Sequence, residues 1–566
     1  MSVGKKLLNS PETCVDEMLH GVEVLYPSLS VNTKARIVMI NKGRKKSGQV
    51  GLLSGGGSGH EPFCSGYVGN GMLTAAVAGS VFASPPPQNI ISAIRNVAAV
   101  CDGGVVVFIM NYTGDILNFG LATETARKEG YNVESFVFGE DCSRKDPGIV
   151  GKRGMCGSVL LFKICGALAE EGKTMKEILS AAEKLTSNMA TLGVCLSACS
   201  LPGSPPLFSI SDDSLQVGVG IHGEAGTDSM KMCSANEVIK KLLHRISEAL
   251  NIAKGDEVAV LLNNLGATSN LELGIVANEV YNQLGEKGVN VNRLYSGGLM
   301  TSLDMAGVQI TILKTKNNPE WVQYLDSSTE AYAWPGKPLS ILSNKNEIIV
   351  EAETEIPNAG VKYSEKQVKV LKQCLISMSQ SIIASEQKLN LLDSGCGDGD
   401  TGTTLRRLGE AIIQNIDNIQ LSYPSSCMRR LARLAEDVVG GTSGAIYSLL
   451  FIGAASDIPD WGAACKSSIN MIMKYSVARV GHRTMMDALI PAAERFEREV
   501  SSGTSWKKAL DLAVSEADAG CKKTLSMKAK CGRASYVDSS NLKDVDAGAY
   551  AVVVWLQALQ KELSNV

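Results

Sequence analysis

The sequence predicts two domains, an α/β domain followed by an all-helical domain. Three observations carry this prediction. A chain of 566 residues exceeds the size at which one hydrophobic core stops growing. Its first half alternates short apolar runs, rich in β-branched residues, with helical stretches. Its second half shows helical spacing throughout, with no convincing strand.

Five apolar runs in the first half predict strands. They are continuous rather than alternating, which is typical of strands buried on both faces of a parallel or mixed sheet. Glycine-rich or polar loops follow several of them, including SGGGSGHEP, NYTGD and NNLGATS. Ligands of open α/β sheets bind at the carboxyl ends of strands, so these loops are the expected binding region. The runs are VGLLSG (50–55), GVVVFIM (104–110), VESFVFG (133–139), EVAVLLNN (257–264) and VQITILK (308–314).

The second half is predicted to be helical because its apolar residues recur at intervals of three and four. Val368, Leu371, Leu375, Met378 and Ile382 show this spacing before LNLLD. Four further helices are expected over SSCMRRLARLAEDVV, WGAACKSSINMIMKY, WKKALDLAVSEADAGCKKTL and AGAYAVVVWLQALQKEL.

A segment with proline, glycine and charged residues separates the halves. We expect a first domain over residues 1–337, a linker over 338–365 and a second domain over 366–566. The run EIIVEA inside this linker could instead belong to the first domain.

Composition favours an ordinary globular protein, with 45% hydrophobic and 20% charged residues. A net charge of -3 gives no electrostatic footprint for nucleic acid. We expect no membrane span, because no apolar run approaches about 18 residues. The N-terminal segment lacks the apolar core of a signal peptide. The 15 cysteines form no CxxC pair, which argues against disulfides or zinc and favours the cytoplasm.

The segment DSGCGDGDTGTT (393–404) is the sharpest signal of a metal site. Asp393, Asp398 and Asp400 place three carboxylates within eight residues, where they repel one another unless a cation lies between them. Magnesium prefers such oxygens and also binds nucleotide phosphates. An EF-hand is excluded because its twelfth position falls on Gly409. The alternative is a solvated acidic turn.

Three other segments of the second half could hold phosphates. VVGGTSGAIY (438–447) reads as a glycine-rich turn that opens a helix, with Thr442 and Ser443 in the turn. Tight helix packing through glycine explains it nearly as well. GHRTMMDAL and CGRASY add Arg483, Thr484 and Arg533, each of which taken alone has a structural explanation.

Two histidines in the first half lie among glycines. His60 ends SGGGSGH, where it could act as an acid or base beside open backbone amides, and Asp115 ends NYTGD. His222 lies in GVGIHGEAG, where a neutral imidazole could act as a nucleophile and Glu224 could orient it. The alternatives are a capping or core role for His60 and a buried, hydrogen-bonded role for His222.

These motifs together resemble the ATP-dependent dihydroxyacetone kinases. The resemblance rests on LLSGGGSGHEP, NYTGD, ATLGVCLSACSLPGS, GIHGEAG, NNLG, GDGDTGTT, GGTSGAIY, RTMMDAL and GRASY. They occur in the order of the family, from about residue 5 to about residue 560. The sequence is similar in particular to the animal branch, which combines triokinase and FMN cyclase activity.

The resemblance implies a substrate-binding K domain with mixed sheets in two subdomains and a nucleotide-binding L domain built as a helical barrel. The residue matching His222 forms a hemiaminal with the substrate carbonyl. The residue matching Asp115, helped by His60, takes the proton of the attacking hydroxyl. Substrate hydroxyls are bound by the residues that match Gly57, Ser58, Gly59, His60 and Asp115.

The resemblance also implies that Asp393, Asp398 and Asp400 hold magnesium ions that bridge the ATP phosphates. The residues expected to line the nucleotide site are Thr401, Gly402, Thr403, Thr404, Thr442, Ser443, Ser476, Thr484, Met485, Gly532, Arg533 and Ala534.

The function expected from this resemblance is ATP-dependent phosphorylation of dihydroxyacetone, and of glyceraldehyde, by a cytoplasmic homodimer. One alternative is FAD-AMP lyase (FMN cyclase) activity on FAD, with manganese as a suitable ion. That reaction would use the L-domain site without His222. Another alternative is a binding or regulatory protein without turnover.

The chain departs from the family pattern at four positions. The family lysine before NYTGD is Met110, so a cation is replaced by an apolar thioether and weaker or altered substrate binding is expected. In the second domain a usual glycine is Ser476, an acid is His482 and a proline is Ala547. These three changes leave the aspartates intact.

Overall fold

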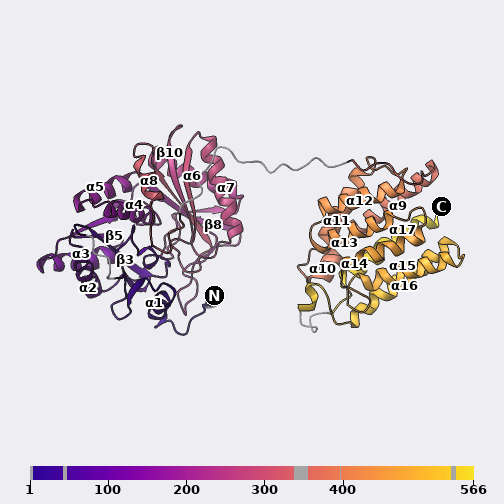
Figure 1. The fold of residues 1–566 in the computed structure, drawn as a ribbon, viewed down its shortest axis with the longest axis horizontal. Helices are drawn as coiled ribbons and strands as arrows, with labels where there is room; N and C mark the ends of the chain where they lie inside the picture. The colour runs from indigo at the N-terminus through magenta and orange to yellow at the C-terminus, as the bar shows by residue number, and fades with distance from the viewer. Residues whose placement is uncertain (1–3, 42–46, 337–354, 396, 537–542, 566) are drawn as a thin grey trace. The chain divides into compact units, whose positions relative to one another are not determined.

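The protein forms two compact units in a computed structural model, Met1–Glu347 and Ile348–Val566. The structure describes residues 4–41, 47–336, 355–395, 397–536 and 543–565. The two units are drawn at opposite ends of the colour scale in Figure 1. Most of the predicted linker, including EIIVEA, lies outside the described residues.

The first unit contains a six-stranded mixed sheet. Strand β3 pairs in parallel with β4 and β5, and β5 pairs in parallel with β6, while β1, β2 and β4 are joined by antiparallel pairing. The strand order is β1 (Leu29–Asn32), β2 (Ile37–Ile40), β4 (Ala75–Val81), β3 (Gly51–Ser58), β5 (Val105–Met110) and β6 (Val133–Phe138).

A second mixed sheet of six strands completes this unit. Among the strands that the structure describes, β10 and β11 are the one parallel pair of this sheet, and β12 pairs antiparallel with both β10 and β7. The strand order is β11 (Asn290–Gly297), β10 (Glu257–Asn264), β12 (Gly307–Lys314), β7 (Met189–Cys195), β8 (Ser214–Val217) and β9 (Asp228–Lys231).

Helices cover both faces of the first sheet, which explains its continuous apolar runs. Leu52, Val106 and Phe108 pack toward helices α4 and α5, and the alternate residues Leu53 and Val107 pack toward α2 and α3. The core on the α4 side also includes residues of β10 and β12, so the two sheets share it. The helices are α1 (Cys14–Leu25), α2 (Pro87–Ala98), α3 (Thr113–Lys128), α4 (Ser158–Glu170), α5 (Met175–Ser187), α6 (Ala235–Leu250), α7 (Asn270–Glu286) and α8 (Glu320–Asp326).

The five predicted strands are present as β3, β5, β6, β10 and β12. Strand β6 differs from the expectation, because four of its six residues are not buried. It lies at the edge of the sheet, where only one neighbouring strand covers it. The described structure confirms an α/β first unit built of mixed sheets.

The described residues of the second unit form helices joined by loops and contain no strand. Each long helix packs on the next along the series α9, α11, α12, α13, α14, α15, α16 and α17, and α17 packs on α9. This closes a ring, which confirms the predicted helical barrel (Figure 1). The bounds are α9 (Glu365–Ala384), α10 (Glu386–Ser394), α11 (Thr401–Asn415), α12 (Pro424–Val438), α13 (Gly441–Ala455), α14 (Trp461–Tyr475), α15 (Met486–Ser501), α16 (Trp506–Lys523) and α17 (Ala547–Ser564).

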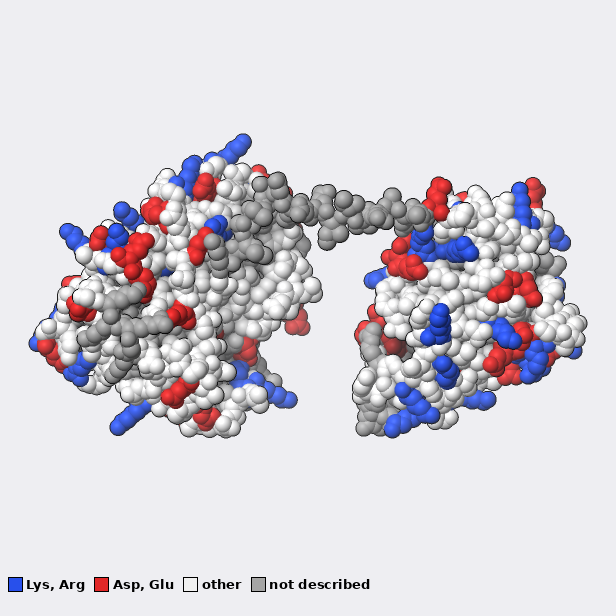
Figure 2. All heavy atoms as spheres, in the orientation of Figure 1, with Lys and Arg blue, Asp and Glu red and all other residues white. Residues whose placement is uncertain are grey.

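Acidic and basic side chains are interspersed on the face of each unit that Figure 2 shows. None of the helices in the described part of the chain is both long enough and apolar enough to span a membrane.

Candidate active site

His60 is buried directly after strand β3 and keeps one ring nitrogen without a partner. The side chain is 2% exposed, and its Nδ1 lies 2.9 Å from the carbonyl oxygen of Thr301. A carbonyl only accepts, so Nδ1 carries the hydrogen and Nε2 presents a lone pair. No group of the described residues forms a hydrogen bond with Nε2. Burial, together with the nearby His222, lowers the pKa of His60 to about 3, which makes the ring neutral at pH 7.

His222 meets His60 although the two lie in loops that follow strands of different sheets, β8 and β3. Their ring centroids lie 4.7 Å apart with the planes nearly perpendicular. The side chain of His222 is 22% exposed, so the imidazole is open to a small ligand. Glu224 accepts a hydrogen bond of 2.9 Å from the backbone N–H of His222, and its other oxygen lies 3.8 Å from Nδ1. The carboxylate of Glu224 thus lies beside the ring of His222, and its role in orienting that ring stays a prediction.

Asp115 brings a buried carboxylate to the same place. It lies in the first turn of α3 and is 5% exposed, and its Oδ1 atom has no hydrogen-bond partner in the part of the chain that the structure describes. A Cβ atom on Gly56 would lie 3.8 Å from Oδ2 of Asp115, so this carboxylate borders the glycine loop that leads to His60. Burial raises the pKa of Asp115 to about 6, against the opposing effects of Ser84 and His222.

Two aromatic residues that the sequence analysis missed complete the walls around the histidines. The ring of Phe82 stacks on His60 at 5.0 Å, and the ring of Tyr112 contacts His222 edge-on at 4.5 Å. Tyr112 lies inside NYTGD and could have been found there. Phe82 has no sequence signal, but its φ of 57° is a left-handed conformation that non-glycine residues rarely adopt. Such strain is typical of functional sites.

The predicted glycines of the segment that leads to His60 allow its backbone to approach Phe82 and Ala83 closely. A Cβ atom on Gly57 would lie 2.8 Å from the backbone nitrogen of Ala83, and one on Gly59 would lie 2.8 Å from the ring of Phe82. The hydroxyl of Ser58 donates to the carbonyl of Gly79 at 2.8 Å, so its side chain is already bonded within the protein.

Met110 ends strand β5 and packs into the core that the two sheets share. It is 3% exposed. A Cβ atom on Gly154 would lie 3.1 Å from both Cβ and Cε of Met110. The family lysine is therefore replaced here by a side chain that fits an apolar environment.

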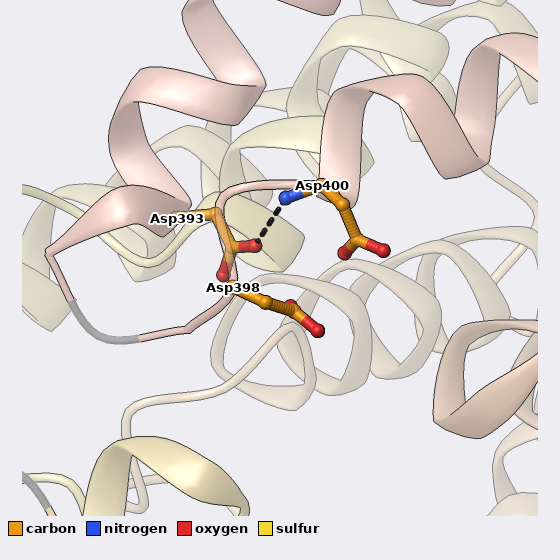
Figure 3. Close-up of side chains that lie close together, drawn as sticks. All are labelled: Asp393, Asp398 and Asp400. Atoms are coloured by element: carbon orange, nitrogen blue, oxygen red, sulfur yellow. Dashed lines mark hydrogen bonds between the residues drawn. The ribbon is translucent and has the colours of Figure 1, made fainter. Parts of the chain in front are cut away.

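The three aspartates of the second unit gather into one cluster (Figure 3). Asp393, Asp398 and Asp400 each offer an oxygen, and these atoms lie within 4.8 Å of one another. Asp393 lies in the last turn of α10, and its Oδ2 accepts hydrogen bonds from the backbone N–H groups of Asp400 and Thr401 at 3.1 and 3.3 Å. These bonds fold the loop so that the carboxylates converge. The cluster fits a magnesium ion, which takes carboxylate and water oxygens.

The predicted nucleotide residues lie at helix ends of the barrel. Thr401–Thr404 begin α11, Thr442 and Ser443 begin α13, and Ser476 follows α14. Open N–H groups at helix N-termini favour phosphate, which suits the first two segments. Thr484 and Met485 directly precede α15. Gly532, Arg533 and Ala534 lie in or beside a short 3-10 helix, Arg533–Tyr536.

Some of these residues have structural roles of their own. The hydroxyl of Thr403 donates to Glu386 at 3.1 Å and accepts from Asn390 at 2.9 Å. Gly402 packs tightly on α10, since a Cβ atom there would lie 2.1 Å from the carbonyl oxygen of Glu386. Their contact with a nucleotide would be made by the backbone.

Two of the segments that were predicted to bind the nucleotide lie side by side. Nδ1 of His482, in GHRTMMDAL, lies 3.1 Å from Sγ of Cys531, in CGRASY. Arg483 is 2% exposed and donates to the carbonyl of Asp544 at 2.8 Å, which supports its structural interpretation. The sequence analysis missed Asp487, whose carboxylate accepts from the backbone N–H of Thr484 at 2.8 Å and holds this turn.

Comparison with known proteins matches each of the two units to a domain family. The Dak1 domain family matches residues 20–333, and the DAK2 domain family matches residues 395–561. The human protein named triokinase/FMN cyclase is 38% identical over 578 residues, which cover 99% of this chain and 100% of that protein.

The chain belongs to the dihydroxyacetone kinase family.

Solved structures of this family match both units. The dihydroxyacetone kinase of C. freundii in complex with AMP-PNP and Mg2+ is 29% identical, covers 99% of this chain and 100% of its own, and has a TM-score of 0.67. A dihydroxyacetone kinase operon co-activator is 36% identical with a TM-score of 0.54. The match to that co-activator covers 57% of this chain and 98% of its own. The co-activator thus matches only part of this chain, and the remainder of the chain has no counterpart in it.

Proposed function

We propose that the protein is an ATP-dependent dihydroxyacetone kinase. The domain of residues 1–337 would bind the triose and the domain of residues 366–566 would bind ATP. The observation that carries this proposal is the pairing of His222 with His60 beside Asp115 in the first unit. The aspartate cluster of the second unit supports a nucleotide with its metal ion. The extent of the matches favours an enzyme over a co-activator, because the human triokinase/FMN cyclase matches 99% of the chain and the co-activator matches 57%.

His222 is the proposed covalent anchor. Its Nδ1 faces Glu224, so Nε2 is the nitrogen left to attack a carbonyl. The attack forms a bond between Nε2 and the central carbon and breaks the π bond of the carbonyl. The carbonyl oxygen gains a proton from water and Nδ1 of the ring releases its own proton to water, so the product is a neutral hemiaminal. A hemiaminal requires a carbonyl, so dihydroxyacetone and glyceraldehyde would bind and glycerol would be rejected.

Asp115 and His60 suit proton transfer from the substrate hydroxyl. A pKa of about 6 leaves Asp115 ionised at pH 7 but still basic enough to accept a proton. The lone pair on Nε2 of His60 can accept a hydrogen bond from the bound triose. His60 itself, with a pKa near 3, would orient the substrate rather than hold its proton.

Asp393, Asp398 and Asp400 would hold magnesium, and the bound ion would neutralise the negative charge of the phosphates during transfer. Thr401, Thr442 and Ser443 lie at helix N-termini that can bind phosphate oxygens through N–H groups. The role of the protein is to position the phosphates, because phosphoryl transfer needs alignment more than covalent catalysis.

The test measures ADP release by the purified chain with magnesium, ATP and dihydroxyacetone. We expect turnover that requires dihydroxyacetone, is absent with glycerol and is lost in His222→Ala. His244→Ala serves as the matched control, because His244 is a surface histidine with a side chain 70% exposed. Equal turnover by His222→Ala and the control would overturn the covalent step, and no turnover by the native chain would overturn the kinase function.

FMN cyclase activity is a second candidate, favoured by the human relative named triokinase/FMN cyclase. Conversion of FAD would use the aspartate cluster, with manganese as a suitable ion, and would not need His222. We therefore expect Asp398→Asn to lose both activities, and His222→Ala to lose only the kinase. Asp437→Asn, a change at an exposed aspartate of α12, is the control for the first variant.

We further propose a cytoplasmic homodimer. None of the 14 cysteines that the structure describes forms a disulfide, which supports a reducing compartment. Sedimentation of the purified chain tests the dimer.

A further inference from the structure

Arg153 lies in the loop before α4, outside every motif discussed above, and joins the two sheets beside His222. Its guanidinium donates from Nε to Asp141 at 2.8 Å and from Nη2 to the carbonyl oxygen of Gly218 at 2.8 Å. Nη2 also lies 3.3 Å from the hydroxyl of Ser143. These bonds fix two of the three guanidinium nitrogens, and the planar group then fixes the direction of the third.

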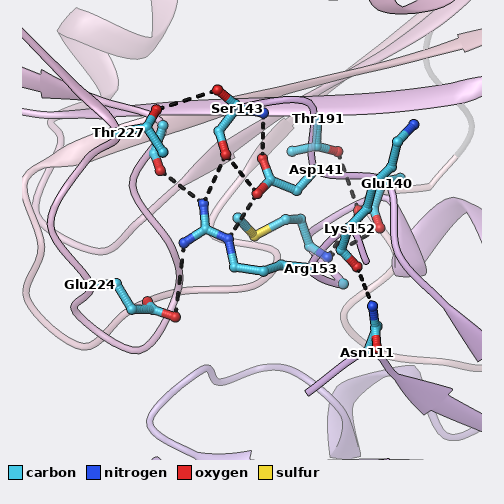
Figure 4. Close-up of polar contacts among 12 residues, drawn as sticks. Asn111, Glu140, Asp141, Ser143, Lys152, Arg153, Thr191, Glu224 and Thr227 are labelled. Atoms are coloured by element: carbon cyan, nitrogen blue, oxygen red, sulfur yellow. Dashed lines mark hydrogen bonds and ion pairs between the residues drawn. The ribbon is translucent and has the colours of Figure 1, made fainter. Parts of the chain in front are cut away.

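The third nitrogen, Nη1, points toward Glu224 (Figure 4). It lies 3.9 Å from Oε1 of Glu224, the same oxygen that lies 3.8 Å from Nδ1 of His222. Oε2 of Glu224 accepts from the backbone N–H of His222. Burial raises the pKa of Glu224, but His222 and Arg153 outweigh it and lower this pKa to about 2. Glu224 is therefore an anion held between a cation and the imidazole.

The glycines around His222 leave room for this arrangement. A Cβ atom on Gly220 would lie 2.1 Å from Oε2 of Glu224 and 2.7 Å from Nη1 of Arg153. Any side chain there would displace both partners. At position 223, where φ is +73°, a Cβ atom would lie 2.2 Å from Leu207. The glycines around His222 thus leave space for the Arg153–Glu224 pair as well as for a substrate.

The other side of Arg153 is anchored by buried acids. Asp141 has a side chain that is 7% exposed and also accepts from the backbone N–H and the hydroxyl of Ser143. The neighbouring Glu140 is fully buried and accepts hydrogen bonds from the backbone N–H groups of Met155 and Gly157. These bonds fix the loop on both sides of Arg153, so the guanidinium is held by the scaffold and not by the substrate.

We propose that Arg153 is a positioning residue that holds Glu224 against Nδ1 of His222 and so leaves Nε2 as the nitrogen that meets the substrate carbonyl. The effect of Arg153 on catalysis rests on the proposed kinase function, whereas its effect on the tautomer of His222 does not. A carboxylate beside Nδ1 favours the tautomer with hydrogen on Nδ1, and the lone pair required for attack then lies on Nε2. Without Arg153, Glu224 could turn away and the ring would sample both tautomers.

The test reads the tautomer of His222 without turnover. Full-length protein with 15N-labelled histidine gives ring signals for five histidines, and the spectrum of His222→Ala identifies those of His222. We expect the Nδ1–H tautomer in the native chain and mixed tautomers in Arg153→Ala. Glu224→Gln, which keeps an acceptor for the backbone of His222, gives the same change if Arg153→Ala does not fold. Ring signals of His222 that stay native in the folded variants would overturn the proposal.

Kinetics provide a second readout that separates positioning from general damage. Arg153→Ala is expected to lower kcat/KM for dihydroxyacetone about tenfold or more while KM for ATP stays unchanged. Millimolar guanidinium ion should restore part of this loss by occupying the vacated place. A loss that guanidinium does not restore, with an unchanged His222 tautomer, would show a structural role and refute positioning. Failure of the native chain to phosphorylate dihydroxyacetone would refute the function instead, and the tautomer experiment would still decide the role of Arg153.

Discussion

Replacement of Asp115 by asparagine is expected to stabilise the folded protein at neutral pH while removing activity. The pKa of this carboxyl rises from 3.8 to about 6 on folding, chiefly because it is buried. Because the pKa is higher in the folded state, the protonated carboxyl of Asp115 favours folding relative to the ionised form. This contribution to stability is fully present below about pH 4 and is lost as the pH rises through about 6. At pH 7.5 the buried charge therefore costs up to about 3 kcal/mol, from roughly two pKa units at 1.36 kcal/mol each.

Asparagine has nearly the same shape and cannot ionise, so it avoids this cost. Urea unfolding of native and Asp115→Asn protein, at pH 7.5 and at pH 4, measures the difference in free energy of unfolding. We expect the variant to be more stable by about 1–3 kcal/mol at pH 7.5 and about equal at pH 4. The exposed Asp212→Asn should show no such pH-dependent difference. A variant that is less stable than native protein at pH 7.5 would refute the reasoning.

Three further predictions concern activity. If Asp115 is the base, kcat/KM for dihydroxyacetone decreases as the pH is lowered past about 6, the pKa of Asp115, and is about tenfold lower at pH 5 than at pH 7.5. A kcat/KM that does not change over this pH range would exclude Asp115 as the base. Met110→Lys, which restores the family cation, is expected to lower KM for dihydroxyacetone, and unchanged kinetics would contradict a role for Met110. Chelation of divalent ions should abolish ADP release and readdition of magnesium should restore it, with Asp398→Asn needing more magnesium; activity in excess chelator would exclude the metal site.

Several long apolar strands and amphipathic helices could be predicted from the sequence because burial imposes a strong pattern, although β7 (Met189–Cys195), which is buried at every residue, was missed. Strand β5 and helix α14 lie within one residue of the predicted bounds. The short strands β8 and β9 were missed, since half of β8 and all of β9 are not fully buried and carry little apolar signal. Helix α15 was missed as well, and it contains Pro491, a residue that usually argues against a helix interior.

The site could be predicted only as separate motifs. Glycines around His60 and His222 indicated close backbone approach, and the structure shows that they lie against Phe82, Glu224 and Arg153. Pairing of the two histidines depends on how the two sheets share a core, which local patterns do not encode. Arg153 gave no signal because a single arginine in a loop is ordinary until its partners are known.

The most direct test of the account is the state of the bound substrate carbon. An NMR spectrum of dihydroxyacetone labelled with 13C at its central carbon, added to excess protein, shows whether that carbon remains a carbonyl. We predict a signal in the tetrahedral range that is present in native protein and in His244→Ala and absent in His222→Ala. A bound ligand that keeps its ketone signal in the native protein would contradict covalent capture by His222.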